Sequence, residues 1–168
     1  MSSSMYASSI PVFERMLTAT SKILAKAETD AEARGIDPNV LLSSRLAPDM
    51  FPLVRQVQIA TDMAKGCCSR LAGTEVPKWE DTETSFAELQ DRIERSLAHM
   101  RAFVPDQLNG SEDKDIELLI GGQTMPFKGL PYLQFFVLPN FYFHLSMTYA
   151  ILRHNGLQVG KRDFLGVT

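Results

Sequence analysis

Apolar residues recur every three to four positions in four long stretches of the chain, which is the spacing that places them on one face of an α-helix. These stretches cover residues 9–35, 49–73, 84–105 and 130–154. The first three seams are Phe13, Met16, Leu17, Leu24, Ala27 and Ala31; Leu53, Val57, Ala60, Ala64, Cys67 and Leu71; and Phe86, Leu89, Ile93, Leu97 and Met100. The pattern predicts four helices.

Helix start and stop residues support these boundaries. Ser9 can cap the first helix, with Pro11 just inside its start, and Ser85 or Thr84 can cap the third. Gly73 closes the second helix. Pro139 either kinks the fourth helix or marks its first turn.

The period changes in the segment DIELLIGGQTMPFKG, residues 115–129. Ile116, Leu118 and Ile120 alternate with polar neighbours before a Gly-Gly pair, and Met125 and Phe127 alternate after it. A small β-hairpin is therefore predicted before the fourth helix. The C-terminal segment LQVGKRDFLGVT is short and rich in glycine, so no further element is predicted there.

The order of these elements predicts an all-α fold, a four-helix bundle with long connections and one small hairpin, as a single domain over residues 1–168. The connections between helices one and two and between helices three and four are long enough for a crossover.

The fourth helix carries polar residues within an otherwise apolar and aromatic surface. Asn140, His144 and Thr148 follow one another at four-residue spacing, and the helical period places Asn140 and His144 in the apolar stripe of Leu133 and Val137. An inward polar side chain without a hydrogen-bond partner costs about 1–3 kcal/mol. A partner on a facing helix, or a bound species, is therefore expected.

Gln58 and Asp62, one turn apart on the second helix, are the expected partners of His144. The predicted inter-helix pocket is lined by Gln58, Asp62, Asn140, His144 and Thr148. The pair of His144 and Asp62 has three interpretations: a metal half-site, a general acid/base couple, or a hydrogen bond that fixes helix register. No catalytic residue is assigned. A divalent metal is one alternative, and no cofactor is the expected outcome.

Charge and composition limit the kinds of binding partner and the cellular location that are expected. The formal net charge is −3 and the sequence pI is about 5.6, without the basic patch of nucleic-acid-binding proteins, so no nucleic acid is expected. The N-terminal segment lacks the features of a secretory signal. The adjacent Cys67 and Cys68 suit neither a disulfide nor a metal site, and a cytoplasmic location is expected.

A membrane span is one alternative for the fourth helix, since residues 129–152 contain no Asp, Glu, Lys or Arg. Two prolines and several polar residues interrupt this stretch, and the other amphipathic helices need an apolar partner. A buried core helix is therefore predicted, with no membrane. His154 is expected to complement the dipole at the end of this helix, and His99 is expected to be solvated.

Two segments resemble a known family. LAPDMFPLVRQVQIATDMAKGCCSRLAG and LPNFYFHLSMTYAILRHNG followed by GKRDFLG resemble signatures of an uncharacterised family of bacterial and fungal proteins, grouped with the DinB-like (DinB/YfiT-like) four-helix bundles. The resemblance implies a metal site built from a His on helix two and a His-x-x-x-His pair on helix four, and in some relatives thiol-dependent transferase activity. Here His144 matches the first member of the pair, Thr148 stands at the second, and helix two offers Gln58 or Asp62.

Two hypotheses about function remain open. In the first, the pocket is a degenerate metal or small-molecule site whose reaction is unknown, and if the protein is an enzyme, His144 lies in a cavity open to solvent. In the second, the protein is a non-catalytic binding or structural module whose buried polar residues fix helix register. A homodimer is expected in both, because Phe135, Phe136, Phe141, Tyr142 and Phe143 span nearly all sides of helix four.

Overall fold

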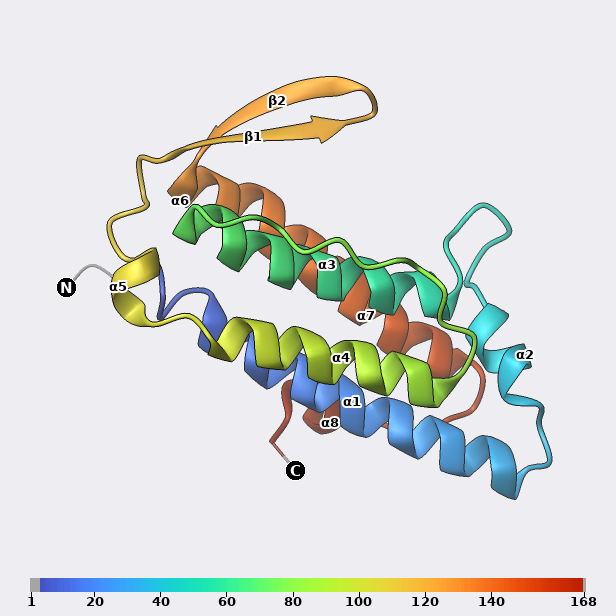
Figure 1. The fold of residues 1–168 in the computed structure, drawn as a ribbon. Helices are drawn as coiled ribbons and strands as arrows, with labels where there is room; N and C mark the ends of the chain where they lie inside the picture. Colours follow the sequence, from blue (N-terminus) through green and yellow to red (C-terminus); the bar gives the residue numbers. More distant parts are fainter. Residues whose placement is uncertain (1–3, 168) are drawn as a thin grey trace.

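The computed structural model describes residues 4–167. Four long helices form the bundle, as predicted (Figure 1). They are α1 (Ile10–Ala33), α3 (Leu53–Ala72), α4 (Phe86–Arg101) and α7 (Leu138–His154). Short helices occupy the connections: α2 (Pro38–Ser43), α5 (Pro105–Leu108) and α6 (Gly129–Pro131). The all-α fold with long connections is confirmed.

The helix ends follow from local chemistry. Gly73 adopts a left-handed conformation, with φ 77°, and ends α3. The Ser85 side chain accepts a hydrogen bond from the Glu88 backbone N–H and caps α4. Ser9 flanks α1 but does not cap it through its side chain, because its hydroxyl donates to the Met5 carbonyl at 2.6 Å.

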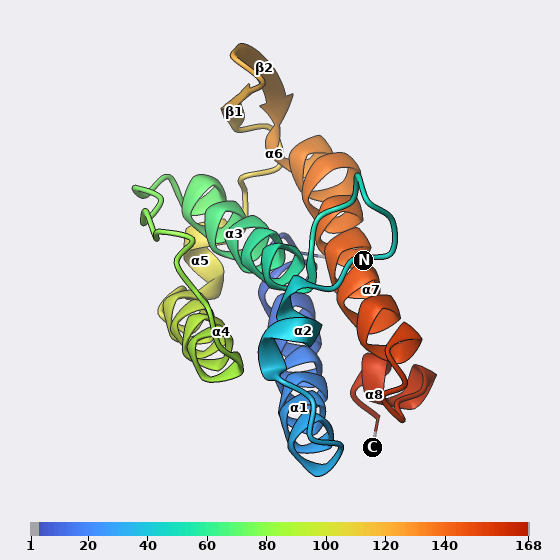
Figure 2. The same ribbon diagram turned by 90° about the vertical axis from the view of Figure 1, so that its right-hand side faces the viewer.

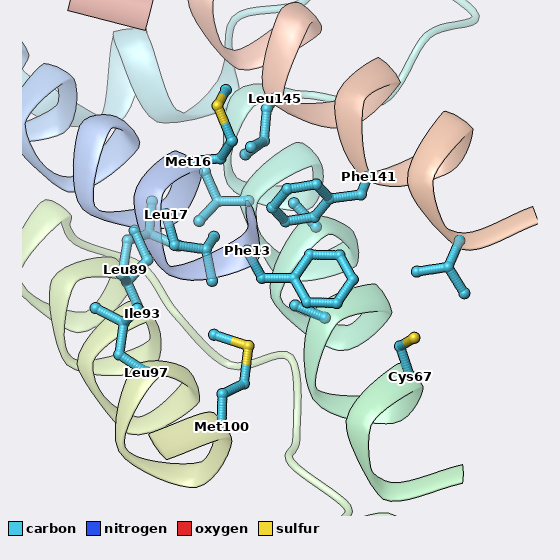
Figure 3. Close-up of a cluster of buried hydrophobic side chains, with 14 of the residues drawn as sticks. Phe13, Met16, Leu17, Cys67, Leu89, Ile93, Leu97, Met100, Phe141 and Leu145 are labelled. Atoms are coloured by element: carbon cyan, nitrogen blue, oxygen red, sulfur yellow. The ribbon is translucent and has the colours of Figure 1, made fainter. Parts of the chain in front are cut away.

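The core lies where the four long helices meet, with α3 packed against both α7 and α4 and with α1 packed against α4 (Figure 2). Figure 3 shows the rings of Phe13 of α1 and Phe141 of α7 facing one another, with Met100 of α4 below Phe13 and Met16 of α1 beside Leu145 of α7. The rings of Phe13 and Phe141 make an edge contact with centroids 4.9 Å apart. Both rings are fully buried, so they anchor α7 to α1.

A π-helical segment, η1 (Tyr132–Val137), joins α6 to α7 and changes the inward face of the last helix. A π-turn inserts one extra residue and so rotates everything after it. The stripe predicted through Leu133, Val137, Asn140 and His144 is therefore wrong at Asn140, where Phe141 takes the inward position, whereas His144 is buried as predicted. Pro139 lies in the first turn of α7, directly after the π-helical segment, and has no N–H to donate to a carbonyl of the preceding turn.

The predicted hairpin is confirmed. Strands β1 (Asp115–Ile120) and β2 (Gln123–Lys128) pair antiparallel, with Leu118 opposite Met125, and project from one end of the bundle (Figure 1). Gly129 at its base packs so closely that a Cβ there would lie 1.8 Å from the Ser111 carbonyl oxygen.

The C-terminal segment contains an element that the sequence did not predict. Lys161–Leu165 form a short helix, α8, which packs against α1. The Asp163 carboxylate accepts from the Gly160 backbone N–H and pairs with Lys26 of α1, while Arg15 donates to the Leu165 carbonyl. These tertiary contacts stabilise a helix that is too short to form alone.

The continuous helical stretch Gly129–His154 is long and apolar enough to span a membrane by length and composition, with a mean hydropathy of 1.3. One side of it, including Phe141, Leu145 and Ile151, is buried within the bundle, as expected for the core helix of a soluble fold.

Candidate functional site

His144 links the two central helices through Gln56. The His144 side chain is 7% exposed, and its Nδ1 lies 2.7 Å from Oε1 of Gln56 on α3. Gln56 is itself buried, at 1% exposed. Figure 2 shows α3 and α7 side by side, so this contact joins neighbouring helices inside the bundle.

The orientation of the Gln56 amide fixes the tautomer of His144. The amide nitrogen of Gln56 donates to the Phe51 carbonyl at 2.9 Å, so the amide oxygen must face the imidazole. Nδ1 of His144 therefore carries the proton and donates it to Oε1 of Gln56. Nε2 is left as the acceptor nitrogen with a free lone pair.

Nε2 of His144 reaches solvent. Within residues 4–167, Nε2 has no hydrogen-bond partner, whereas every fully buried side-chain nitrogen or oxygen in that range has one. Nε2 is therefore not fully buried. Burial lowers the pKa of His144 below its ordinary value, and the positive charge of Arg55 lowers it further. The site is therefore a neutral imidazole that presents one lone pair at the surface.

The predicted five-residue pocket does not assemble around His144. The partner of its ring is Gln56, in place of Gln58 or Asp62. Asn140 donates to the Phe136 carbonyl and Thr148 to the His144 carbonyl, both within the last helix. The Asn140 amide and the Thr148 hydroxyl thus bond to backbone carbonyls of their own helix and do not face a shared cavity.

Gln58 and Asp62 belong to a second network centred on Arg92 of α4, whose side chain is fully buried. Its Nε donates to the Thr61 hydroxyl at 2.9 Å, and its Nη2 to Asp62 at 3.0 Å. Its Nη1 donates to Glu83 at 2.9 Å, and Glu83 also accepts from the Gln58 amide. The sequence reasoning missed Arg92 altogether.

This network fastens the connection between α3 and α4. Arg92 also pairs with Asp81 at 3.0 Å and donates to the Glu80 carbonyl, so it holds the segment that precedes α4. Figure 1 shows that segment running along α3 and α4. Trp79 adds to the attachment, with Lys65 4.2 Å and Arg95 4.4 Å from its ring centroid.

A hollow of about 280 Å³ lies beside Arg92, between the connection and α4. Its lining carries both signs of charge: Glu80, Thr82, Glu83, Glu88, Asp91, Arg92 and Arg95. The nitrogens of Arg92 are already bonded to protein groups, and Glu88 accepts from the Thr84 backbone N–H as a helix cap. Arg92 and Glu88 are therefore occupied by hydrogen bonds that stabilise the fold.

A serine–histidine pair lies elsewhere between α3 and α4. Nε2 of His99 is 2.9 Å from the Ser69 hydroxyl, and the His99 ring packs edge-on against Trp79 and Phe103. The expectation that His99 is solvated is therefore wrong. Ser69 is fully buried, so no substrate could reach its oxygen, and the pair serves packing.

Cys67 and Cys68 are free and buried. Burial raises the pKa of the Cys68 thiol to about 12 and that of Cys67 well above its ordinary value. Both remain protonated at neutral pH, so neither supplies the thiolate that metal binding or thiol chemistry requires.

The metal site implied by the DinB-like resemblance does not fit the residues present. In residues 4–167, no group of three or more His, Cys, Asp or Glu side chains is arranged to hold a metal ion. Asp62, the expected second ligand, is bound by Lys65 at 2.7 Å and by Arg92 at 3.0 Å. A carboxylate already paired with two cations is a poor partner for a third.

Comparison with known proteins identifies the family. Residues 5–165 match the family described as a domain of unknown function (DUF1993). The chain belongs to this family. It is also similar to the crystal structure of a DinB family member protein from Shewanella denitrificans, with 39% sequence identity, a TM-score of 0.87, and coverage of 97% of this chain and 92% of that chain. No functionally curated protein matches it.

The histidines of this DUF1993 chain are expected to make its stability depend on pH. Burial lowers the pKa of both His144 and His99 in the folded protein. The unfolded chain, with histidine pKa values near ~6.5, therefore binds more protons in the window just below that pH. Their contribution is complete above pH ~6.5 and is lost as the pH falls.

Urea unfolding at pH 7.5, 6.5 and 5.5 measures this effect. Each histidine contributes at most about 1.4 kcal/mol per pH unit. The double variant His144→Gln/His99→Gln is expected to flatten the profile. A wild-type profile that is flat from pH 7.5 to 5.5 would contradict the assignment.

Proposed function

We propose that this protein is a non-catalytic interaction module of the DinB-like fold. His144, which matches a metal-binding position of DinB-like relatives, here forms a structural hydrogen bond with Gln56 that joins α7 to α3. The observation that carries the proposal is the chain of contacts from His144 Nδ1 to Gln56 Oε1, and from Gln56 Nε2 to the Phe51 carbonyl. A cytoplasmic location is part of the proposal, supported by two free buried cysteines.

The way the polar side chains are bonded supports this proposal over an enzyme. The carboxylates next to α3 are paired with Arg92, Lys65 and Arg55, so none is poised as a general acid or base beside His144. Five surface hollows within residues 4–167 are lined by side chains other than His144 and Gln56. Polar pairs of this kind fix one helix register among the many that an apolar interface permits.

One observation favours a second candidate function, small-molecule or metal binding at His144. Its Nε2 lone pair touches solvent, and the hydrogen bond from Nδ1 to an amide oxygen is the arrangement that orients a ligating imidazole. A ligand there would have one protein donor and would be held weakly.

A double-mutant cycle on the His144–Gln56 hydrogen bond tests the proposal. His144→Leu and Gln56→Leu are each expected to lower the free energy of unfolding by about 1–3 kcal/mol, because each strands a buried polar partner. The double variant replaces both groups by apolar ones and is expected to recover most of that loss. The measurement is urea unfolding followed by circular dichroism.

Metal analysis of protein purified without an affinity tag distinguishes the second candidate. Under the proposal, zinc, nickel and iron are all far below one equivalent in the wild type and in His144→Ala. The matched control is His154→Ala, at an exposed position on the same helix. Stoichiometric metal that is lost only in His144→Ala would overturn the proposed function in favour of a metal-binding one.

A further inference from the structure

The hairpin is a two-stranded sheet, so each of its strands has one free edge. No further strand pairs with β1 or β2 within residues 4–167, and Figure 2 shows the hairpin projecting beyond the long helices. A strand at the edge of a sheet presents a row of unpaired N–H and C=O groups, which is a template for one more strand. The two free edges of this hairpin differ in whether they can accept such a strand.

The turn decides which backbone groups point outward. Ile120 and Gln123 flank a two-residue turn in which both glycines have positive φ, 56° for Gly121 and 81° for Gly122, as in a type I′ turn. The Ile120 carbonyl accepts from the Gln123 N–H across this turn, and hydrogen-bonded and non-hydrogen-bonded pairs then alternate along the strands. The residues whose backbone groups point outward are therefore Asp115, Glu117 and Leu119 on β1, and Thr124, Pro126 and Lys128 on β2.

A proline closes the edge of β2 and leaves that of β1 open. Pro126 has no N–H and lies at the middle outward position of β2, so a strand added there would lose its central hydrogen bond. On β1, no backbone N–H or C=O of Asp115, Glu117 or Leu119 has a hydrogen-bond partner within residues 4–167. All three residues are exposed, and Leu119 is 77% exposed. β1 therefore presents an N–H and a C=O to solvent at each of them.

The side chains along the open edge are acidic. Asp115 and Glu117 lie on the outer face of β1. Asp115 pairs with Lys128 at 2.6 Å across the hairpin, whereas Glu117 lies opposite Pro126 and has no cation partner in the part of the chain that the structure describes. Opposite charges at facing positions of neighbouring strands stabilise pairing, and like charges destabilise it. The edge therefore favours a strand that places Lys or Arg opposite these two carboxylates.

We infer that β1 binds an extended basic segment of a partner protein as a third strand of the hairpin sheet; the inference rests on the proposed function as an interaction module. The backbone of β1 supplies the hydrogen bonds, and its two carboxylates select Lys or Arg at alternate positions of the added strand. Leu119 packs against the aliphatic part of the next side chain. Three residues form a small interface, so a dissociation constant of roughly 10–100 μM is expected.

The same charges disfavour a second copy of this chain at the edge. A two-fold axis pairs β1 with its own copy in antiparallel orientation, and only the register centred on Glu117 uses all three outward residues. That register places the two copies of Glu117 directly opposite each other, which is destabilising. Moving the axis by one residue leaves only two of the outward residues paired. The carboxylates thus hinder pairing between copies at an edge that accepts a basic strand.

Calorimetric titration of the full chain with synthetic peptides tests the inference. The probe is a peptide of about nine residues, blocked at both ends, in which lysine and valine alternate. Two control peptides carry glutamate in place of lysine, or methyl groups on the lysine backbone nitrogens. Both are expected to bind roughly 10-fold or more weakly than the probe, because the first removes the charge complementarity and the second removes the hydrogen bonds.

Two proline variants at facing positions distinguish the edges. Leu119 and Thr124 lie opposite each other, and the N–H of each points outward. Leu119→Pro gives β1 the block that Pro126 gives β2, and it is expected to weaken peptide binding roughly 10-fold or more. Thr124→Pro places the same ring on the edge that is already blocked, and it is expected to leave the affinity unchanged. Circular dichroism confirms that both variants are folded.

A charge reversal tests the selection of a basic strand without a change in the backbone. Glu117→Lys is expected to reverse the preference, so that the glutamate peptide binds more tightly than the lysine peptide. Glu94→Lys, at an exposed position on α4, makes the same change in net charge and is expected to retain the preference of the wild type. Equal affinity of the wild type for the two peptides would contradict the inference.

Amide hydrogen exchange locates the added strand. With peptide at ~10 times its dissociation constant, the N–H groups of Glu117 and Leu119 are expected to exchange roughly 10-fold more slowly, because they donate to the peptide. The outward N–H of Thr124 on β2 is expected to exchange as in the free protein. Protection of Thr124 in place of Glu117 and Leu119 would assign the peptide to the wrong edge and overturn the inference.

Three further results would overturn the inference. They are no binding of the lysine peptide at ~1 mM, binding that Leu119→Pro leaves unchanged, and a wild-type dimer that Leu119→Pro dissociates and Thr124→Pro does not. The last result would assign the edge to a second copy of this chain. The proposed function fails by a different result, stoichiometric metal that depends on His144, so the two failures are distinguishable.

Discussion

Arg92→Leu is expected to lower the free energy of unfolding by about 3–5 kcal/mol, the cost of breaking a buried ion pair from one side. The guanidinium is fully buried and pairs with Asp62, Asp81 and Glu83. Without it, Asp62 keeps Lys65 and Asp81 keeps Arg55. Glu83 loses its cation and retains only the Gln58 amide. The loss is therefore concentrated at one nearly buried carboxylate.

Urea unfolding measured in parallel by circular dichroism and by Trp79 fluorescence tests this prediction. Trp79 is the only tryptophan and lies on the segment that Arg92 holds, so its emission reports detachment of that segment. The matched control is Arg95→Leu, an exposed arginine over the same ring, with an expected loss below ~1 kcal/mol. Adding Glu83→Gln to Arg92→Leu should recover part of the stability. A loss of less than ~1 kcal/mol for Arg92→Leu would contradict the prediction.

The burial of Arg92 could not be predicted from the local pattern of the sequence. It lies three residues after Leu89, on the edge of an apolar seam, where an arginine is usually solvated. Its burial depends on acidic groups from residues 80–83, which approach it only after the chain has turned back between α3 and α4. A long-range pairing of this kind leaves no periodic signal.

The helices and the hairpin could be predicted because their signals are local. Apolar spacing, the Ser85 cap, Gly73 and the alternation around the Gly-Gly pair each act within a few residues. The short helix Lys161–Leu165 could not, because contacts of Lys26 and Arg15 with it come from the far end of the chain.

For the candidate site, the sequence located His144 correctly between helices but chose the wrong partner. Gln58 and Asp62 were chosen because they lie one turn apart beside the seam of α3. The rotation of α3 in the bundle directs them toward Arg92 of α4, and it directs Gln56 toward α7. That rotation is set by how α3 packs against two helices at once, which no single-helix pattern encodes.

Phe141→Ala is expected to lower the free energy of unfolding by about 3–5 kcal/mol, the range for removing a large aromatic side chain from a core. Its ring is fully buried and meets Phe13 edge-on at 4.9 Å. Asn140→Ala, one position earlier, is expected to cost less than ~1.5 kcal/mol, because it removes one hydrogen bond to the Phe136 carbonyl of its own helix.

This pair of variants tests which residue of the last helix, Asn140 or Phe141, faces the core. In a regular α-helix continuing from Leu133 and Val137, Asn140 would face the core. The π-helical turn over Tyr132–Val137 adds one residue and brings Phe141 to that position instead. The two variants are compared by urea unfolding at one protein concentration, so that any self-association affects both alike. If Asn140→Ala proved more destabilising than Phe141→Ala, the extra residue would have to lie elsewhere and the contact between Phe13 and Phe141 could not be formed as described.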